Sequence, residues 1–331
     1  MTNKATIDLL GEVSESRRVE GSRTFLDLDV TDFLKPSELE EFQEQTGLSK
    51  SPATLVLPNP PGGRSDQSAS QNRIVVTFLH GLGGGRGSWG LGDPVRGPQE
   101  GLVVNVLRTV EALGKEAIGL VLAGLGRDGG SLDSASCSAG ITPQHYSRQL
   151  EYVLRYLGLL NCDRIIGIGH SVGAAALWEF AAADFSTSGR RVGVVGSSPK
   201  LSIVSISPVR TIAESRHLTL GCQIAGKGLD LLLSPVASLW HSSSRRLSEL
   251  VATASVLRGL ARQGRFKGSL VGVKGLVLIG ERDWVARVGL WASLQRASCG
   301  WPVALLAGLG HNILWHPMTA EVLTGYLPSL L

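Results

Sequence analysis

The chain has 331 residues, of which 43% are hydrophobic and 18% charged, and a formal net charge of +4, which indicates a globular protein with a sizeable core. Its length suits one large domain that carries an insertion. No apolar run approaches the ~18 residues of a membrane span, and the first residues lack the apolar segment of a secretory signal. We therefore expect a soluble protein without a transmembrane segment.

Four cysteines are scattered along the chain, at positions 137, 162, 222 and 299, and none belongs to a C-x-x-C pair. This spacing argues against a zinc site and against a disulfide framework, and it favours a reducing compartment. We therefore expect a cytoplasmic protein with no metal and no other cofactor. The small net charge gives no reason to expect a nucleic-acid partner.

Residues 1–50 are acidic, with 11 Asp and Glu side chains against 6 Lys and Arg. Alternation over 23–30 predicts a first strand, and a short helix is predicted from Pro36 because proline is favoured in the first turn of a helix. We expect residues 1–50 to form an extension ahead of the main domain. A second strand is predicted over 53–57, before a loop rich in Pro and Gly at 58–72.

Apolar strand segments alternate with helical segments through the rest of the chain. The later strands are predicted at 73–79, 117–122, 164–168, 201–206, 275–280 and 301–307, and the helices at 102–113, from Thr142, and directly after the strand at 164–168. This alternation favours a mostly parallel α/β sheet with right-handed crossovers, flanked by helices.

The alternation stops in one segment, between the strands at 201–206 and 275–280. Two helices are predicted there, at 228–240 and 245–262. The second would have an apolar face formed by Leu247, Leu250, Val251, Ala254, Leu257 and Ala261. The segment is therefore an insertion between two consecutive strands.

This pattern divides the chain into four parts. After residues 1–50, the core would comprise residues 51–208 and 271–331, with a helical cap at 209–270 between them. The cap segment holds 9 basic against 3 acidic side chains. It would either form a lid that favours lipophilic or anionic substrates, or simply pack on the sheet edge with a solvated charged face.

The segment RIIGIGHSVGAAAL joins an apolar strand to an alanine-rich helix through the turn Gly169-His170-Ser171-Val172-Gly173. Glycine is required beside a serine on so tight a turn, because the neighbouring backbone leaves no room for a Cβ. The turn also puts Ser171 at a helix N-terminus, where free N–H groups favour developing negative charge. This context predicts that Ser171 is a nucleophile.

A nucleophilic serine needs a base to take its proton, and the base needs a carboxylate to hold it in the right tautomer. Asp283 and His311 each follow a later predicted strand. The order Ser171, Asp283, His311 is the one expected when a G-x-S-x-G turn opens the site. Glu281 is an alternative acid, but its spacing from Gly280 fits the pattern less well than that of Asp283.

At these points the chain resembles the α/β-hydrolase superfamily, in its serine esterase, lipase, thioesterase and lactonase branch. Five stretches carry the likeness: HGLGG at 80–84, GLGRDGGS at 124–131, GHSVG at 169–173, GERDWV at 280–285 and GHNILWHP at 310–317. Together they span residues 73 to about 325, whereas residues 1–50 match nothing in the family. The resemblance implies an α/β-hydrolase fold with a helical cap inserted between late strands.

The resemblance also implies residue roles. Ser171 would be the nucleophile, His311 the general base and Asp283 the acid that orients it. The backbone N–H groups of Leu82 and Val172 would form the oxyanion hole. The residues expected near the substrate are His80, Gly81, Gly83, His170, Trp240 and Trp284. The two histidines in this set are also compatible with a structural role.

These features predict a serine hydrolase that cleaves a carboxylic ester, thioester or lactone of a small-molecule acyl substrate through an acyl-enzyme. An acyltransferase or a lyase could use the same residues, and a receptor could use the fold to bind a small molecule. An epoxide hydrolase or a haloalkane dehalogenase is disfavoured, because those relatives place an aspartate where Ser171 stands.

Overall fold

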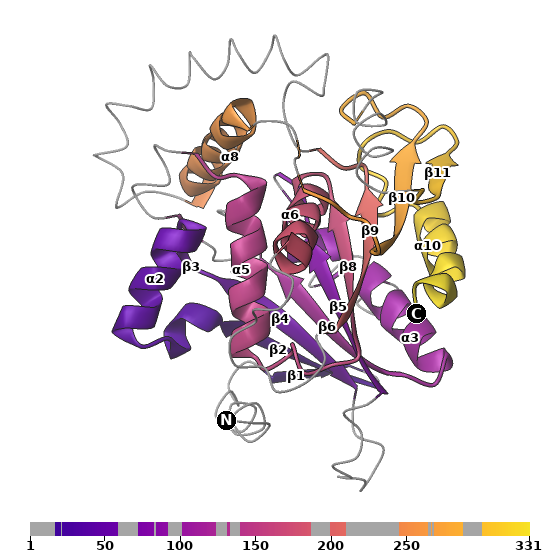
Figure 1. The fold of residues 1–331 in the computed structure, drawn as a ribbon, viewed down its shortest axis with the longest axis horizontal. Coiled ribbons are helices and arrows are strands. Elements are labelled where there is room, and N and C mark those ends of the chain that lie inside the picture. The colour runs from indigo at the N-terminus through magenta and orange to yellow at the C-terminus, as the bar shows by residue number, and fades with distance from the viewer. Residues whose placement is uncertain are drawn as a thin grey trace, which may run out of the picture.

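The computed structural model describes residues 17–20, 22–58, 72–82, 84–91, 101–123, 131–132, 140–186, 199–209, 245–263, 266, 268–286 and 300–331. In these ranges a central sheet is covered by helices on both faces (Figure 1). The main sheet there has nine strands in the order β1-β2-β4-β6-β5-β8-β9-β10-β11.

The strands of the main sheet are β1 (Arg17–Glu20), β2 (Arg23–Asp29), β4 (Pro52–Pro58), β5 (Arg73–Leu79), β6 (Glu116–Leu122), β8 (Arg164–His170), β9 (Lys200–Ile206), β10 (Lys274–Gly280) and β11 (Val303–Leu306). The neighbours from β6 across to β11 pair in parallel, and β1, β2 and β4 add antiparallel pairs at one edge. A separate short pair joins β3 (Leu48–Lys50) to β7 (Ser131–Leu132). The expected mostly parallel sheet is therefore confirmed.

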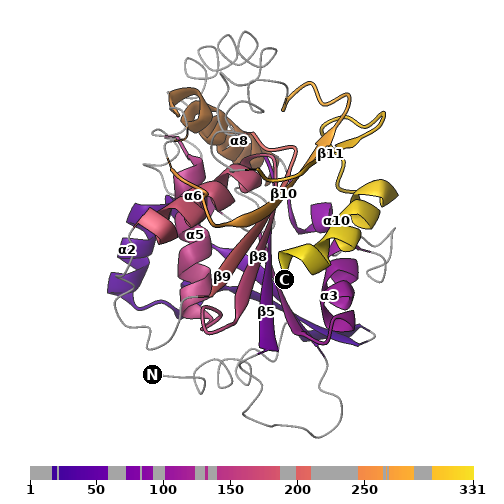
Figure 2. The same ribbon diagram turned by 45° about the vertical axis from the view of Figure 1, so that its right-hand side comes forward.

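The helices form two layers. One face of the sheet carries α3 (Leu102–Ala112) and α10 (Pro317–Leu330), and the other carries α2 (Pro36–Thr46), α5 (Pro143–Tyr156) and α6 (Val172–Ser186) (Figures 1 and 2). Each face has its own buried apolar cluster, as expected for strands covered on both sides. In the part of the chain that is described, no helix is both long and apolar enough to cross a bilayer.

Shorter elements complete the described chain. Two 3-10 turns, η2 (Val30–Phe33) and η4 (Arg86–Trp89), follow strands β2 and β5, and α8 (Arg245–Arg262) lies in the insertion between β9 and β10. Helix α8 lies near α5 and α6, beyond the ends of the parallel strands (Figures 1 and 2).

Most predicted elements agree with the structure. The strand predicted at 73–79 and the helix predicted at 245–262 have the same limits as β5 and α8. The sequence does not predict α10, because Gly325 and Pro328 interrupt its apolar pattern. It does not predict β1 either, because the sequence RRVE is mostly charged, which an edge strand tolerates.

The face that α8 buries agrees only in part with the predicted one. Among the predicted residues whose burial is described, Ala254 is buried, Leu257 is half-buried and Ala261 is exposed. The helix also buries Ala252, Val256 and Leu260. The helix predicted at 228–240 lies outside the described residues and stays a prediction.

A close contact between two backbones explains this difference. A Cβ on Gly259 would overlap the carbonyl oxygen of Ile141, just before α5, so glycine lets the helix approach. The Ile141 N–H also donates to the carbonyl oxygen of Ser255 at 3.1 Å. Apolar periodicity could not predict the buried face, because a glycine contact sets it.

The segment before residue 50 is integrated with the main sheet. Strand β2 pairs with β4, and α2 packs on α5 through an edge-to-face contact between Phe42 and Tyr152, with ring centres 5.5 Å apart. The Tyr152 hydroxyl also donates to Glu41 at 2.7 Å. The sheet therefore continues on both sides of the boundary drawn at residue 50.

Candidate active site

Ser171 lies on a sharp turn between β8 and α6. Its φ is 55°, in the left-handed region that residues with a side chain rarely adopt. A Cβ on Gly169 would lie 2.6 Å from the Cα of Ala174, and one on Gly173 would overlap the carbonyl oxygen of Leu79. Both glycines are therefore needed for the turn, in agreement with the sequence argument.

Backbone hydrogen bonds to the next strand fix the position of Ser171. Its N–H donates to the carbonyl oxygen of Ile206, the last residue of β9, at 2.9 Å, and its carbonyl oxygen accepts from the N–H of Val209 at 3.1 Å. Ser171 is only 5% exposed. The serine is thus held at the C-terminal edge of the sheet by its neighbouring strand.

His311 lies between Ser171 and Asp283. Its Nε2 is 3.1 Å from Ser171 Oγ, and its Nδ1 is 3.1 Å and 3.0 Å from the two carboxylate oxygens of Asp283. When Nδ1 donates to the carboxylate, Nε2 of the neutral ring can accept the serine proton. The three side chains follow β8, β10 and β11, whose carboxyl ends meet at one edge of the sheet.

Asp283 is a buried carboxylate with several hydrogen-bond donors. It is 1% exposed, and its Oδ1 accepts the backbone N–H groups of Val285 and Ala286, each at 2.9 Å. Burial alone would raise the pKa of Asp283, but the hydrogen bond and charge interaction with His311 help to hold it below its usual value. Glu281 instead accepts a backbone N–H from the loop after β11 at 2.8 Å, so the geometry favours Asp283.

The loop after β5 brings Gly81 against Ser171. A Cβ on Gly81 would lie 2.5 Å from the Cβ of Ser171, so glycine is required. The carbonyl oxygen of Gly81 accepts hydrogen bonds from His80 Nδ1 at 2.9 Å and from the N–H of Gly84 at 3.1 Å. Because C=O and N–H of a trans peptide point in opposite directions, these two bonds fix the direction of the Leu82 N–H.

His80 belongs to the frame of this loop. It is 3% exposed, and while Nδ1 donates to Gly81, its Nε2 lies 3.4 Å from the hydroxyl of Tyr146 on α5. Both ring nitrogens therefore have partners inside the protein, which indicates a positioning role, and contact of His80 with the substrate stays a prediction. No local pattern predicts the link to Tyr146, because the two residues are 66 positions apart.

His170 lies between the nucleophile turn and the loop of His311. Its Nε2 is 3.1 Å from the backbone carbonyl oxygen of His311, and the two ring centres are 5.0 Å apart. Burial, together with the nearby His311, lowers the pKa of His170 to about 3. The ring is therefore neutral at physiological pH.

The other expected residues have varied positions. Val172 is buried and begins α6, where backbone N–H groups have no partner within the helix. Trp284 directly follows Asp283 and is 54% exposed, so its ring meets solvent. Gly83 and Trp240 lie outside the described residues.

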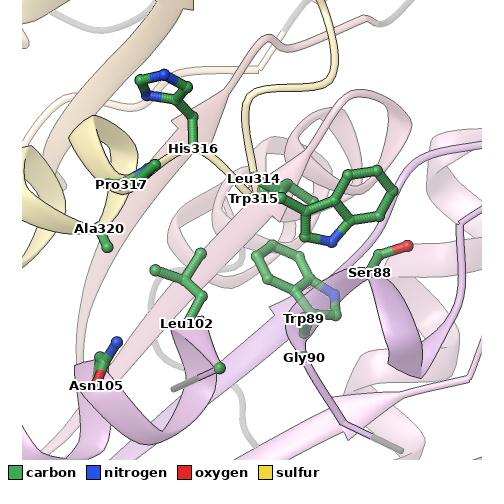
Figure 3. Close-up of a pocket in the computed structure, with 11 residues that line it drawn as sticks. Ser88, Trp89, Gly90, Leu102, Asn105, Leu314, Trp315, His316, Pro317 and Ala320 are labelled. Atoms are coloured by element: carbon green, nitrogen blue, oxygen red, sulfur yellow. The ribbon is translucent and has the colours of Figure 1, made fainter. Parts of the chain in front are cut away.

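Two hollows are lined by the loop after β5 and the loop that follows His311. The smaller one has a volume of about 110 Å³, and Gly81, Leu82 and His170 are among its lining residues. The larger one has a volume of about 700 Å³ and lies between the first turns of α3 and α10 (Figure 3). The smaller hollow therefore reaches His170, the residue before Ser171, and the larger one lies farther out on the α3 and α10 side of the sheet.

Comparison with known families identifies the family of the chain. A profile described as the alpha/beta hydrolase family matches residues 78–323, which include Ser171, Asp283 and His311. The chain therefore belongs to the alpha/beta hydrolase family. No curated protein matches the sequence.

Solved structures show the same fold at low sequence identity. A thermophilic esterase from Thermogutta terrifontis is 13% identical with a TM-score of 0.51, covering 92% of this chain and 98% of its own. A carboxylesterase of the thaumarchaeon Nitrososphaera gargenis is 12% identical with a TM-score of 0.50, covering 95% and 98%. An epoxide hydrolase from metagenomes of hot environments is 14% identical with a TM-score of 0.50, covering 83% and 94%.

Proposed function

We propose that the protein is a serine hydrolase that cleaves carboxylic esters, thioesters or lactones. The observation that carries this proposal is the continuous chain of contacts from Ser171 through His311 to Asp283. A serine within 3.1 Å of an imidazole, itself 3.0 Å from a buried carboxylate, is the arrangement that activates a hydroxyl for attack on a carbonyl.

The reaction would proceed in two steps. Ser171 Oγ forms a bond to the carbonyl carbon while its proton passes to His311 Nε2, and the resulting imidazolium is stabilised by Asp283. The bond to the leaving oxygen or sulfur then breaks, and that atom takes the proton from Nε2. A water molecule then attacks the carbonyl carbon of the acyl-enzyme while its proton passes to His311 Nε2. The bond to Ser171 Oγ breaks, Oγ takes the proton back, and the acid is released.

The backbone N–H groups of Leu82 and Val172 would stabilise the oxyanion of the tetrahedral intermediate. Two observations support this role: Gly81 lies against Ser171, and Val172 starts helix α6. Removal of one such donor typically costs about 3–4 kcal/mol of transition-state stabilisation. The Val172 N–H also lies at the N-terminus of α6, the positive end of its helix dipole, which favours the developing charge.

The insertion would cover this site and contact the acyl part of the substrate. Val256 and Leu260 of α8 pack on Val172 and Ile141, so the described part of the insertion reaches the residue after the nucleophile. The excess of basic over acidic side chains in 209–270 would favour a lipophilic or anionic acyl group.

We also propose that the protein is cytoplasmic. The described Cys162 is a free thiol whose pKa is raised to about 12, chiefly by burial, which makes it unreactive at neutral pH. A free, buried thiol of this kind suits a reducing compartment.

Turnover assays with the Ser171→Ala variant test the function. The wild-type protein should hydrolyse at least one of a chromogenic acetate ester, an aryl thioester and an aromatic lactone, and Ser171→Ala should lose at least about a thousandfold in rate. Addition of an alcohol acceptor separates the alternatives, because an acyltransferase would give the new ester in place of free acid. Binding of these compounds without any turnover would instead support a receptor.

A further inference from the structure

The cleft between α3 and α10 has the size and position of a substrate pocket. Leu102 from the first turn of α3 and Ala320 from the first turn of α10 form its sides, and the indoles of Trp89 and Trp315 lie at one end (Figure 3). Its volume of about 700 Å³ falls in the range that holds a small organic ligand.

This cleft is next to the hollow that Gly81 and His170 line. Both hollows have Ser88, Leu314 and Trp315 in their linings. The smaller hollow also touches Leu82 and His170, which flank the position of Ser171. A group bound in the cleft can therefore belong to the same molecule whose carbonyl carbon lies at Ser171 Oγ.

The position of the cleft relative to His311 indicates which part of the substrate it holds. The leaving oxygen or sulfur must lie near His311 Nε2, because that atom supplies its proton. The segment that follows His311 lines both hollows: Leu314 and Trp315 line the two together, Asn312 lines only the small hollow, and His316 and Pro317 line only the cleft. Val172, the residue after Ser171, packs instead with Val256 and Leu260 of α8, and we assign the acyl part to that side.

The lining chemistry indicates an uncharged group. Trp315 offers most of the aromatic surface, Leu102 and Leu314 add apolar side chains, and the buried Trp89 lies behind them. Asn105 and His316 are polar side chains in the lining. Among the described residues that line the cleft, none is Asp, Glu, Lys or Arg. Such a lining favours a neutral aryl or branched alkyl group over a charged one.

We propose that the α3–α10 cleft binds the leaving group of the substrate, and that this group is a bulky, uncharged aromatic or branched alcohol or thiol. This assignment rests on the proposed serine hydrolase function. It makes the enzyme selective for the leaving group independently of the acyl group, which lies on the α8 side. The leaving group and the acyl group of the substrate would thus bind on opposite faces of the sheet.

An Ala320→Trp variant, which fills the cleft, tests this proposal. Its matched control is Glu321→Trp, which adds the same side chain at an exposed neighbouring position of α10. Two ester series should be followed by titration of released acid: acetates of methanol, cyclohexanol and 1-naphthol, and methyl esters of acetate, butyrate and octanoate.

Ala320→Trp should lower kcat/KM about tenfold or more for 1-naphthyl acetate and by less than about twofold for methyl acetate. The methyl ester series should keep its wild-type order, and Glu321→Trp should leave both series unchanged. Equal losses on methyl and naphthyl acetate, or a change confined to the acyl series, would overturn the assignment.

A second variant keeps the test valid if Ala320→Trp does not fold. Trp315 is 54% exposed, so Trp315→Ala should fold and should weaken the preference for naphthyl over methyl acetate. Labelling of Ser171 by a small fluorophosphonate separates the two proposals. No labelling of the wild-type protein would reject the serine hydrolase function, whereas labelled variants with unchanged leaving-group preference would reject only the cleft assignment.

Discussion

The ring of His170 donates a hydrogen bond from Nε2 to the backbone carbonyl oxygen of His311, 3.1 Å away. The residue before the proposed nucleophile thus holds the loop that carries the proposed base. The titratable groups that face His170 are His311, Asp283 and His80. Because the ring is buried among them and uncharged, it fixes the loop without adding a positive charge beside His311.

We predict that moderate acidification destabilises the folded protein through His170. The pKa of this ring is about 3 in the folded protein against an ordinary value of 6.5, so between these values only the unfolded chain binds the proton. The contribution of His170 to stability is full above pH 6.5 and is lost as pH falls toward 3, by up to about 1.4 kcal/mol per pH unit.

Urea unfolding of the wild-type protein and of His170→Gln, at several pH values in the upper half of this window, measures the effect. The free energy of unfolding should fall less steeply with pH in the variant. Asp283 has a lowered pKa, so it affects the free energy of unfolding mainly below its ordinary value of 3.8, outside the pH values measured here. Equal slopes in both proteins would contradict a neutral, buried His170.

Replacement of Asp283 by Asn should lower kcat by about 10⁴-fold, because the amide would favour the wrong tautomer of His311. The fold should persist, since an asparagine Oδ1 can still accept the backbone N–H groups of Val285 and Ala286. Glu281→Gln is the control and should change kcat by less than about threefold. Steady-state kinetics on the ester that the wild type hydrolyses fastest measures kcat for both variants. A large loss of kcat in Glu281→Gln with a small loss in Asp283→Asn would assign the acid role to Glu281.

Loss of the His80 ring nitrogens should weaken the oxyanion contact. In His80→Phe the carbonyl of Gly81 loses the donor at 2.9 Å, so only the bond from the Gly84 N–H still orients the Leu82 N–H. We expect kcat to fall about 10–100-fold with little change in KM. Tyr146→Phe removes only the longer contact at 3.4 Å and should cost less than about threefold. An effect of His80→Phe on KM alone would argue for direct substrate contact.

The contact between α8 and Ile141 should depend on glycine. Gly259→Ala should destabilise the protein by about 1–3 kcal/mol, because the added methyl overlaps the Ile141 carbonyl oxygen, although alanine is the better helix former. Gly325→Ala in α10 meets nothing within 4 Å and should instead stabilise by about 0.5–1 kcal/mol. Thermal unfolding compares them, and an increase in Tm for both variants would contradict the close approach of α8.

The sequence predicts the parallel sheet well for a physical reason. Strands such as β5 and β10 are buried on both faces, so each reads as a continuous apolar run. The same topology brings Ser171, Asp283 and His311 together, because each follows a parallel strand and all such strands end at one edge. Local pattern and chain order are therefore enough to predict the proposed triad.

Features that depend on contacts between distant segments could not be predicted in this way. The buried face of α8 depends on the glycine contact with Ile141, and the role of His80 depends on Tyr146 from another helix. The α3–α10 cleft requires knowing that two helices far apart in the sequence lie side by side. The sequence of α10 does not even predict a helix, so the sequence carries no signal for that cleft.

The central claim is that Ser171 is a nucleophile activated by His311, and one measurement tests it most directly. The native protein is treated with a small fluorophosphonate, and the modified residue is located by mass spectrometry of its peptides. We predict one adduct on Ser171, absent in Ser171→Ala and formed far more slowly in His311→Ala. A folded wild-type protein that forms no adduct, or forms one elsewhere while Ser171 stays unmodified, would contradict the account.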